Sequence, residues 1–305
     1  MFIIYELVGL ILLILSPIII LVRIIMGKED LKRFKEKFCL FTKNSGNNET
    51  VWIHGASVGE ILSIVPIIYK FEKDNKIKKI LITSSTTSSA DVFSKFKFKK
   101  AVHQFYPIDI NIFTKIFINY WKPKLAIFVD SEIWPNMYKN LNSKKIPIIL
   151  LNARITKKTF RRWKYFSSFS KNVFNKITLA LPQNNESSKF LQSLGVKKIK
   201  FAGNLKYFGK SNKKLVNNNL INRFSKKVLW CAASTHKKEE IFVGKVHKEL
   251  KSIKKNLLTI IIPRHVNRKN EIINELNKIG LKTQLHSTST KLDKNTDIYL
   301  VDTYG

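Results

Sequence analysis

The sequence predicts an α/β protein with two parallel β-sheets, each built from short strands joined by crossover helices. Short apolar runs recur along the chain, and the segments between them have helical hydrophobic spacing. The runs are continuous rather than alternating, which is typical of strands covered on both faces of a parallel sheet. With 305 residues, 44% of them hydrophobic, the chain is long enough for two domains and too apolar for a disordered protein.

The first expected element is an apolar helix over residues 2–26, interrupted only by Glu6, Ser16, Pro17 and Arg23. Such a helix would be about 36 Å long at about 1.5 Å per residue, which is enough to cross the hydrocarbon core of a bilayer. The segment lacks the charged leader and the cleavage site of a secretory signal. We therefore expect a membrane anchor over residues 1–27. An interfacial hairpin broken at Pro17 is the alternative.

Basic residues follow this segment, and the positive-inside rule then places the body of the protein in the cytoplasm, on the inner face of the cell membrane. Over residues 28–38 they alternate with aromatic residues, a pattern that suits anionic lipid headgroups or an ordinary solvated helix. These basic residues are Arg23, Lys28, Lys32, Arg33, Lys35 and Lys37.

A polar linker over residues 42–50 leads to the first predicted sheet, which we expect in a domain spanning residues 28–208. Its helices include those expected at residues 60–73, 110–121 and 186–194. Its strands are expected at residues 51–54, 79–84, 125–129, 146–151, 177–182 and 199–203.

A segment rich in Lys, Ser and Asn at residues 209–225 is expected to link this domain to a second one at residues 226–305. The helices of the second domain are expected at residues 237–250 and 267–279. Its strands are expected at residues 228–233, 257–263 and 297–301. Because the sequence stops directly after the last of these strands, we expect the second sheet to be incomplete.

The net charge of +34 is extreme, with 55 Lys and Arg residues against 21 Asp and Glu residues. Lysines are spread over the whole length, which fits a lysine-biased proteome or attraction to nucleic acid, anionic lipid or a phosphorylated substrate. The even spread argues against a nucleic-acid-binding face. Cys39 and Cys231 lie far apart and form no Cys-x-x-Cys pair, so neither a disulfide framework nor a zinc cluster is expected.

Two motifs place acidic residues at the ends of predicted strands, where ligands of open α/β sheets bind. His54-Gly55-Ala56-Ser57-Val58-Gly59-Glu60 opens a helix, and Glu60 is either a catalytic carboxylate or a first-turn residue that complements the helix dipole. Asp130-Ser131-Glu132 precedes Trp134-Pro135-Asn136. It resembles an acidic metal motif only weakly, and we expect no metal.

Four further motifs follow strands. Asn152-Ala153-Arg154 leads into a basic, aromatic helix that suits phosphate recognition or a solvated face. Gly203-Asn204-Leu205-Lys206-Tyr207 offers Lys206 as a group that neutralises charge, and Pro263-Arg264-His265 offers Arg264 as a phosphate ligand. Ala233-Ser234-Thr235-His236 has the residues of a helix cap, which we prefer to a Ser–His nucleophile.

In this order, the six motifs resemble those of the transferases of 3-deoxy-D-manno-octulosonic acid (Kdo), and the resemblance runs from the N-terminal helix to the last residue. It implies a GT-B-type fold of two Rossmann-like domains. The N-terminal domain would bind the lipid A precursor, and the C-terminal domain would bind the donor CMP-Kdo. No cofactor is implied.

The resemblance implies an inverting, metal-independent transfer to the acylated disaccharide of lipid IVA. Glu60 would deprotonate the acceptor hydroxyl, since a sugar hydroxyl is a poor nucleophile until its proton leaves. Glu132 and Lys206 match positions that stabilise the transition state, and Pro263 and Arg264 match a CMP contact.

The sequence departs from the family pattern at two places. Tyr207 is followed by Phe208, where the family has an acid after the aromatic residue. Asp302-Thr303-Tyr304-Gly305 matches the start of a family loop whose continuation is not in this sequence, so Tyr304 and Gly305 are binding candidates without their usual neighbours. The alternative function is a truncated, non-catalytic, membrane-associated binding protein of the same family.

Overall fold

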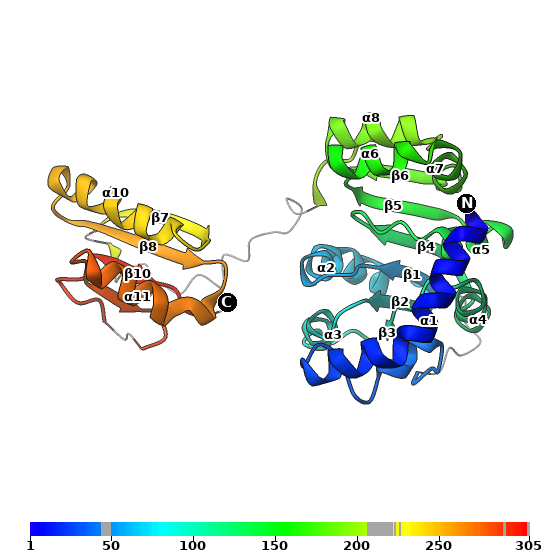
Figure 1. Cartoon of the computed structure of the whole chain (residues 1–305), viewed down its shortest axis with the longest axis horizontal. Coiled ribbons are helices and arrows are strands. Elements are labelled where there is room, and N and C mark those ends of the chain that lie inside the picture. Colours follow the sequence, from blue (N-terminus) through cyan, green and yellow to red (C-terminus); the bar gives the residue numbers. More distant parts are fainter. Residues whose placement is uncertain (44–49, 206–221, 223, 226, 289–290, 304–305) are drawn as a thin grey trace. The chain divides into compact units, whose positions relative to one another are not determined.

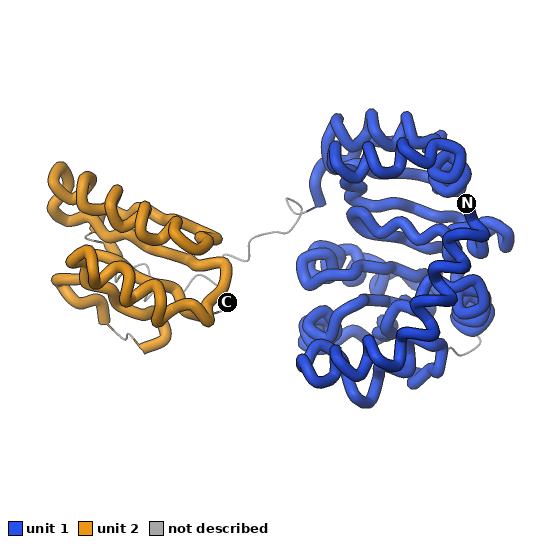
Figure 2. Tube along the Cα trace, in the orientation of Figure 1, with its two compact units in different colours: residues 1–210 blue, residues 211–305 orange. Residues whose placement is uncertain are grey.

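The structure, a computed structural model, describes residues 1–43, 50–205, 222, 224–225, 227–288 and 291–303. It divides into two compact units, Met1–Lys210 and Ser211–Gly305, which are coloured separately in Figure 2. Each unit holds its own parallel sheet (Figure 1).

Unit 1 contains a six-stranded sheet in the order β3-β2-β1-β4-β5-β6, and every neighbouring pair is parallel. The order reverses between β1 and β4, as it does in Rossmann-like domains. The strands are β1 (Thr50–His54), β2 (Lys79–Ser84), β3 (Ala101–Phe105), β4 (Pro123–Val129), β5 (Ile148–Ala153) and β6 (Leu179–Pro182).

Helices cover both faces of this sheet, so that each strand sends alternate residues into two separate cores. In β1, Trp52 packs into the core that holds Phe117 and Tyr138, whereas Ile53 packs with Ile61 and Ile64 on the other face. The helices after β1 are α2 (Val58–Lys73), α3 (Thr87–Ser94), α4 (Asn111–Trp121), α5 (Pro135–Ser143), α6 (Lys157–Tyr165), α7 (Ser167–Phe174) and α8 (Asn185–Leu194).

The apolar N-terminal segment forms one continuous helix, α1 (Phe2–Ile25), with Pro17 inside it. The hairpin alternative is therefore wrong, because the helix continues through Pro17 without a turn. By length and composition α1 is apolar enough to cross a membrane, with a mean hydropathy of 2.9 over 18 residues. It runs beside α4 and α5 in Figure 1.

One side of α1 contacts the rest of unit 1, and the other side carries exposed apolar side chains. Phe2 packs edge-to-face on Phe169 of α7, with ring centroids 4.9 Å apart. Tyr5 donates a hydrogen bond to Asp109. Arg23, in the last turn of α1, pairs with the buried Glu29 beyond the helix. A short 3₁₀ helix, η1 (Phe34–Phe38), follows.

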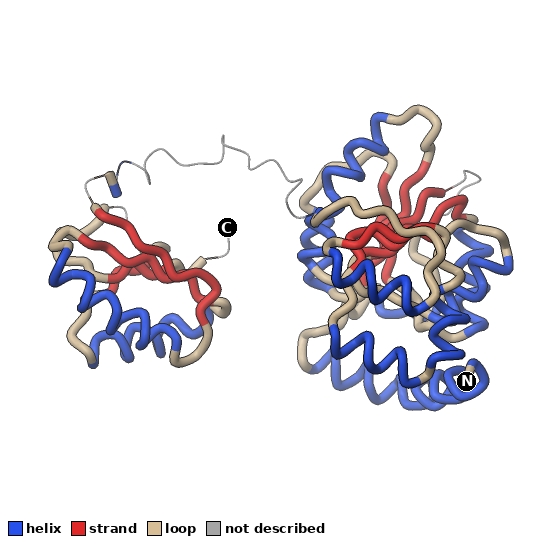
Figure 3. Tube along the Cα trace, turned by 90° about the horizontal axis from the view of Figure 1, so that it is seen from above, coloured by secondary structure: helices blue, strands red, loops and turns tan. Residues whose placement is uncertain are grey.

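Unit 2 contains a four-stranded parallel sheet in the order β7-β8-β10-β9. The helices that connect its strands lie on one side of the sheet (Figure 3), and the core on that side contains Val243, Ile272 and Leu276. The elements are β7 (Val228–Thr235), α10 (Glu239–Ile253), β8 (Leu257–Pro263), η4 (Val266–Arg268), α11 (Lys269–Lys278), β9 (Thr283–Leu285) and β10 (Ile298–Leu300).

The predicted α/β class with two parallel sheets is confirmed, and several local predictions are corrected. Residues 199–203 form no named strand; Ile199 makes only an isolated bridge to Ala180. The strands β3 and β9 were not predicted. The expected cap at residues 233–236 is wrong, because α10 begins later and its N-cap residue is Lys238, without a side-chain cap.

Candidate functional site

The candidate site of unit 1 lies at the carboxyl edge of its sheet, where β1, β4 and β5 end side by side. This arrangement brings together residues that are far apart in the sequence: Glu60 after β1, Glu132 after β4 and Arg154 after β5. Ligands of open α/β sheets bind at this edge, beside the point where the strand order reverses.

The Glu60 side chain is held at the N-terminus of α2. Ser57 is the N-cap residue, and its hydroxyl lies 2.8 Å from Glu60 Oε1. The backbone N–H of Ala56 donates to Glu60 Oε2 at 2.7 Å. Glu60 thus has the geometry of a capping residue, as the helix-dipole alternative predicts. It is nevertheless partly exposed, so its carboxylate remains accessible.

The surroundings of Glu60 favour a carboxylate that can take up a proton. Burial raises its pKa above the usual value, and the negative charges of Glu132 and Asp130 raise the pKa further, against the hydrogen bonds from Ser57 and Ala56. A raised pKa makes a carboxylate a stronger base, which suits general-base chemistry near neutral pH.

Glu132 is held by side chains from two different strand ends. His54 Nε2 lies 3.1 Å from Glu132 Oε2, and Trp134 Nε1 donates to the same oxygen at 2.9 Å. Tyr138 donates to the backbone oxygen of Glu132 at 2.9 Å. The carboxylate is therefore held in one orientation at the edge of the sheet.

Asp130 and Asn152 connect the ends of β4 and β5. Both have left-handed backbones, with φ values of 60° and 53°, a conformation that Asp and Asn tolerate better than most residues. Asn152 Nδ2 donates to Asp130 Oδ1 at 2.6 Å, and Asn152 Oδ1 accepts the N–H of Leu205 at 2.9 Å. Leu205, which precedes Lys206 in the sequence, is thus held at this edge.

A polar pocket of about 380 Å³ lies beside this edge, and Arg154 and Lys157 line it. The hydroxyl of Ser131 donates to the backbone oxygen of Arg154 at 2.6 Å, which ties the pocket to the loop that carries Glu132. The sequence prediction of phosphate recognition by this motif stays a prediction.

In unit 2, the candidate donor-binding residues follow β7 and β8. Pro263 ends β8, and the N–H of Arg264 donates to the Thr235 oxygen at the end of β7, 2.9 Å away. Pro263 is buried, whereas the Arg264 side chain is exposed. The hydroxyl of Thr235 does not cap α10; it donates to Glu240, which also pairs with Arg268.

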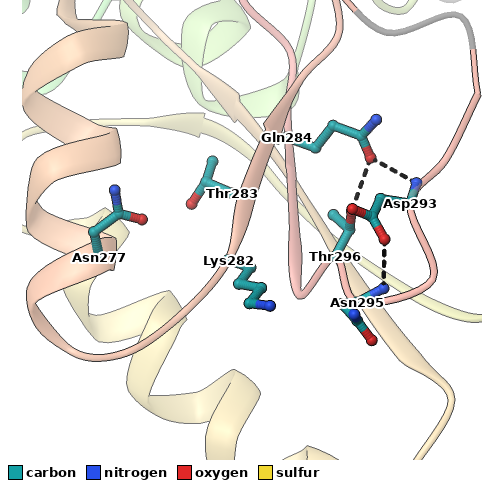
Figure 4. Close-up of a pocket in the computed structure, with 7 residues that line it drawn as sticks. All are labelled: Asn277, Lys282, Thr283, Gln284, Asp293, Asn295 and Thr296. Atoms are coloured by element: carbon teal, nitrogen blue, oxygen red, sulfur yellow. Dashed lines mark hydrogen bonds between the residues drawn. The ribbon is translucent and has the colours of Figure 1, made fainter.

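A pocket of about 370 Å³ in unit 2 lies away from these residues (Figure 4). Lys282 and Thr296 lie just before β9 and β10, at the amino ends of the strands. Gln284 accepts hydrogen bonds from the N–H of Asp293 and the hydroxyl of Thr296. These contacts join β9 to residues 293–296 before β10, and the pocket is not at the edge where ligands bind.

Three predicted site residues, Lys206, Tyr304 and Gly305, lie outside the described residues. Within the described residues, no group of three or more His, Cys, Asp and Glu side chains is arranged to hold a metal ion. The sequence placed His54 and Trp134 in motifs but gave them no role. The contact of His54 with Glu132 depends on the neighbouring positions of β1 and β4, whereas Trp134 contacts Glu132 from two residues further along the same loop.

Solved structures with a similar fold include the UDP-GlcNAc 2-epimerase of Neisseria meningitidis bound to UDP-GlcNAc. The TM-score is 0.56 at 14% identity, and the match covers 85% of this chain and 73% of that one. A likeness at this identity concerns the fold alone. Together with the two parallel sheets, it defines the chain as an α/β protein of GT-B type.

The sequence comparisons go further. The family model described as 3-deoxy-D-manno-octulosonic-acid transferase (kdotransferase) matches residues 32–208. The 3-deoxy-D-manno-octulosonic acid transferase of Rickettsia bellii is 33% identical over 293 residues, which cover 94% of this chain and 69% of that protein. The enzyme of the same name from Haemophilus influenzae is 29% identical, with 84% of this chain and 61% of that protein covered. The chain belongs to the Kdo transferase family of glycosyltransferases.

Proposed function

We propose that the protein transfers Kdo from CMP-Kdo to the lipid A precursor lipid IVA, with inversion at the anomeric carbon and Glu60 as the general base. One observation carries this proposal: the Glu60 carboxylate is partly exposed at the end of β1, close enough to Glu132 and Asp130 for their charges to raise its pKa. Family membership supports Kdo as the transferred sugar.

In the proposed reaction, Glu60 takes the proton from an acceptor hydroxyl as the oxygen attacks the anomeric carbon of Kdo. The new carbon–oxygen bond forms while the bond to CMP breaks, and CMP leaves with the bonding electrons. Glu132 and Lys206 stabilise the transition state. We assign Pro263, Arg264, Tyr304 and Gly305 to CMP binding. Of these, Arg264 would bind the phosphate, because an arginine side chain recognises phosphate through several donors.

We also propose that α1 holds the protein at the cytoplasmic face of the inner membrane, where the lipid acceptor is found. The exposed apolar side of α1 supports association with lipid. The exposed residues Lys28, Lys32 and Lys35 after α1 would face anionic headgroups. Arg33 and Lys37 instead pair with the buried Glu36 and Glu29.

The test is transfer of radiolabelled Kdo from CMP-Kdo to lipid IVA by the purified protein in detergent. Glu60→Gln is expected to lower the transfer rate by about 10²- to 10⁴-fold, the usual effect of losing a general base. Glu72→Gln, at the other end of α2, is the control and should retain the wild-type rate. Full activity of Glu60→Gln would remove Glu60 as the base. Binding of CMP-Kdo by the wild type without any transfer would instead support a non-catalytic binding protein.

A further inference from the structure

Glu240, in the first turn of α10, carries a fully buried carboxylate whose hydrogen-bond partners come from two other segments. The hydroxyl of Thr235, at the end of β7, donates to Oε1 over 3.0 Å. The guanidinium of Arg268, in η4, donates from Nη1 to Oε1 over 3.0 Å and from Nη2 to Oε2 over 3.3 Å. The carboxylate therefore ties the start of α10 to the end of β7 and to the segment that follows β8.

The two residues that hold Glu240 also hold the backbone around Arg264. The backbone oxygen of Thr235 accepts the N–H of Arg264 over 2.9 Å, and the N–H of Arg268 donates to the backbone oxygen of His265 over 3.2 Å. These contacts close a ring, because the buried carboxylate holds Thr235 and Arg268, and each of these holds the chain at or beside Arg264. We call this set of contacts the Glu240 ring; its members are Thr235, Glu240, Arg264, His265 and Arg268.

The ring lies at an irregular point of the sheet. The pairing of β7 with β8 shifts register between Ala233 and Thr235, so Ser234 is an extra residue in β7, and its backbone is left-handed, with a φ of 61°. Bulges of this kind bend a strand, and a left-handed backbone at a residue such as serine persists where the surrounding contacts hold it. The buried hydroxyl of Thr235 supplies such a contact directly after the bulge, since it is bound to Glu240.

The two arginines of the ring have different surroundings. Every guanidinium nitrogen of Arg268 has a carboxylate partner, since Nη1 and Nη2 bind Glu240 and Nε binds Glu271 at 3.1 Å. The Arg268 side chain is only 15% exposed. The Arg264 side chain is exposed, and among the residues that the structure describes none forms an ion pair with it. Arg264 is therefore available to a phosphate group, whereas Arg268 is held by the two carboxylates.

Stability alone does not account for the buried ion pair, because an apolar pair of the same volume is about as stable in a protein interior. We propose that Glu240 is a positioning residue for the nucleotide: the Glu240 ring fixes the backbone of Arg264, whose guanidinium then binds the phosphate of CMP. Glu240 itself is buried and acts only through its neighbours. The inference rests on the proposed assignment of Arg264 to CMP binding.

The first experiment is titration calorimetry of the full chain with CMP. Glu240→Gln keeps the shape of the side chain but removes its charge, and it should weaken CMP binding about 10-fold. In an Arg264→Gln background the same substitution should cause no further loss, because the ring acts through Arg264. Wild-type affinity in Glu240→Gln, or the same fold-loss in both backgrounds, would overturn the proposal.

Two control variants separate positioning from stability. Glu271→Gln removes the other carboxylate partner of Arg268 and leaves both contacts with Glu240, so it should bind CMP like the wild type. Asp297→Asn removes a second buried carboxylate of unit 2, which pairs with Lys251 and lies just before β10, at the opposite edge of the sheet. It should lower the urea midpoint as Glu240→Gln does and keep the wild-type affinity for CMP. Equal losses of affinity in Asp297→Asn and Glu240→Gln would show a merely structural role.

Thr235→Val tests the ring without removing the ion pair, and it replaces Glu240→Gln as the test if that variant does not fold. The substitution exchanges the hydroxyl for a methyl group and keeps the backbone oxygen that accepts the N–H of Arg264. It should weaken CMP binding about 2- to 10-fold, the effect of losing one hydrogen bond. A folded Thr235→Val variant with wild-type affinity would contradict the positioning role.

These measurements separate the positioning role from the proposed function, because they require no transfer of Kdo and do not involve Glu60. Wild-type affinity in Arg264→Gln would remove the assignment of Arg264 to CMP binding, and this inference with it. A loss of affinity in Arg264→Gln but not in Glu240→Gln would overturn the positioning role alone.

Discussion

The hydroxyl of Tyr5 in α1 donates a hydrogen bond of 2.9 Å to the buried carboxylate of Asp109. The same carboxylate accepts the backbone N–H groups of Asn136 and Met137 at the start of α5, at 3.0 and 2.8 Å. Asp109 thus joins the apolar N-terminal helix to the helix that follows the Glu132 loop. Three donors on one buried carboxylate make this a specific link rather than a loose apolar contact.

The first prediction concerns stability and pH at Asp109. Burial raises the pKa of Asp109 from its usual 3.8 to about 6, against the hydrogen bonds from Asn136, Tyr5 and Met137. The folded state therefore binds this proton more tightly than the unfolded state does. The contribution of Asp109 to stability is complete below about pH 3.8 and is lost as the pH rises through about 6.

The measurement is urea unfolding of the wild type and Asp109→Asn at a series of pH values. As the pH rises through this range, the wild type should lose up to about 3 kcal/mol relative to the variant, because one pKa unit corresponds to about 1.4 kcal/mol. In Tyr5→Phe the loss should be larger and should extend to higher pH, since the Tyr5 hydrogen bond lowers the pKa of Asp109 in the folded state. A difference between wild type and Asp109→Asn that does not vary with pH would refute this account.

The second prediction concerns the pH dependence of transfer. A general base acts only after it has lost its proton, so kcat/KM should rise with pH through the pKa of Glu60, which burial places above the usual 4.5. Two substitutions should move this rising limb of the pH profile of kcat/KM in opposite directions. Glu132→Gln removes a like charge and should move it to lower pH, whereas Ser57→Ala removes a hydrogen bond that lowers the pKa and should move it to higher pH.

The measurement is a pH profile of Kdo transfer for the wild type and both variants, compared by the midpoint of the limb rather than by the maximal rate. Shifts of both variants in the same direction would mean that another group controls the limb.

The strands that the sequence predicted best are those with a nearly continuous apolar run. β2 and β8 were predicted with their observed bounds. In β2 the run follows from burial of the strand on both faces of the sheet, whereas β8 has an exposed residue, Ile262. β3 was missed because it carries His103 and Gln104, whose polar side chains are buried in the fold and hide the strand pattern. β9 is a short edge strand without an apolar run.

The position of the candidate site was predictable, but its internal contacts were not. Glu60 and Glu132 were found because both follow strands, and the carboxyl ends of parallel strands share one edge. The contact between His54 and Glu132 joins residues 78 positions apart. It exists only because β4 returns to pair with β1 after β2 and β3 have been added on the other side. Strand order of this kind is set by packing and leaves no local signal.

The third prediction concerns Arg264 and donor binding. Its backbone is fixed by the hydrogen bond to Thr235, and its exposed side chain is at the carboxyl edge of unit 2. Arg264→Gln should weaken binding of CMP by about 10- to 100-fold, the range expected for a lost hydrogen bond between a cation and a phosphate. Titration calorimetry with CMP measures the change. Lys255→Gln removes an exposed positive charge just before β8, at the opposite edge, and should bind CMP like the wild type. Equal weakening in both variants would show that overall charge, rather than Arg264, attracts the nucleotide.

The last prediction concerns the exposed side of α1. Ile14 and Ile18 are 77% and 64% exposed in a helix whose other side contacts unit 1. If this side is buried in lipid, Ile14→Lys and Ile18→Lys should together release the protein from vesicles that contain anionic lipid, because each lysine in the apolar region of a membrane costs roughly 2.5 to 3.5 kcal/mol. Flotation of the vesicles on a density gradient measures the bound fraction.

Phe242→Lys is the control for this experiment, since Phe242 is an equally exposed apolar residue, 68% accessible, on α10 of unit 2. It should float with the vesicles as the wild type does, because it adds the same charge outside the proposed lipid-facing surface. The contacts of Tyr5 and Phe2 with unit 1 involve the opposite side of α1, so the double variant should unfold at the same urea concentration as the wild type. Continued flotation of a folded double variant would mean that α1 does not hold the protein on the membrane, and that the basic residues which follow it do so through charge alone.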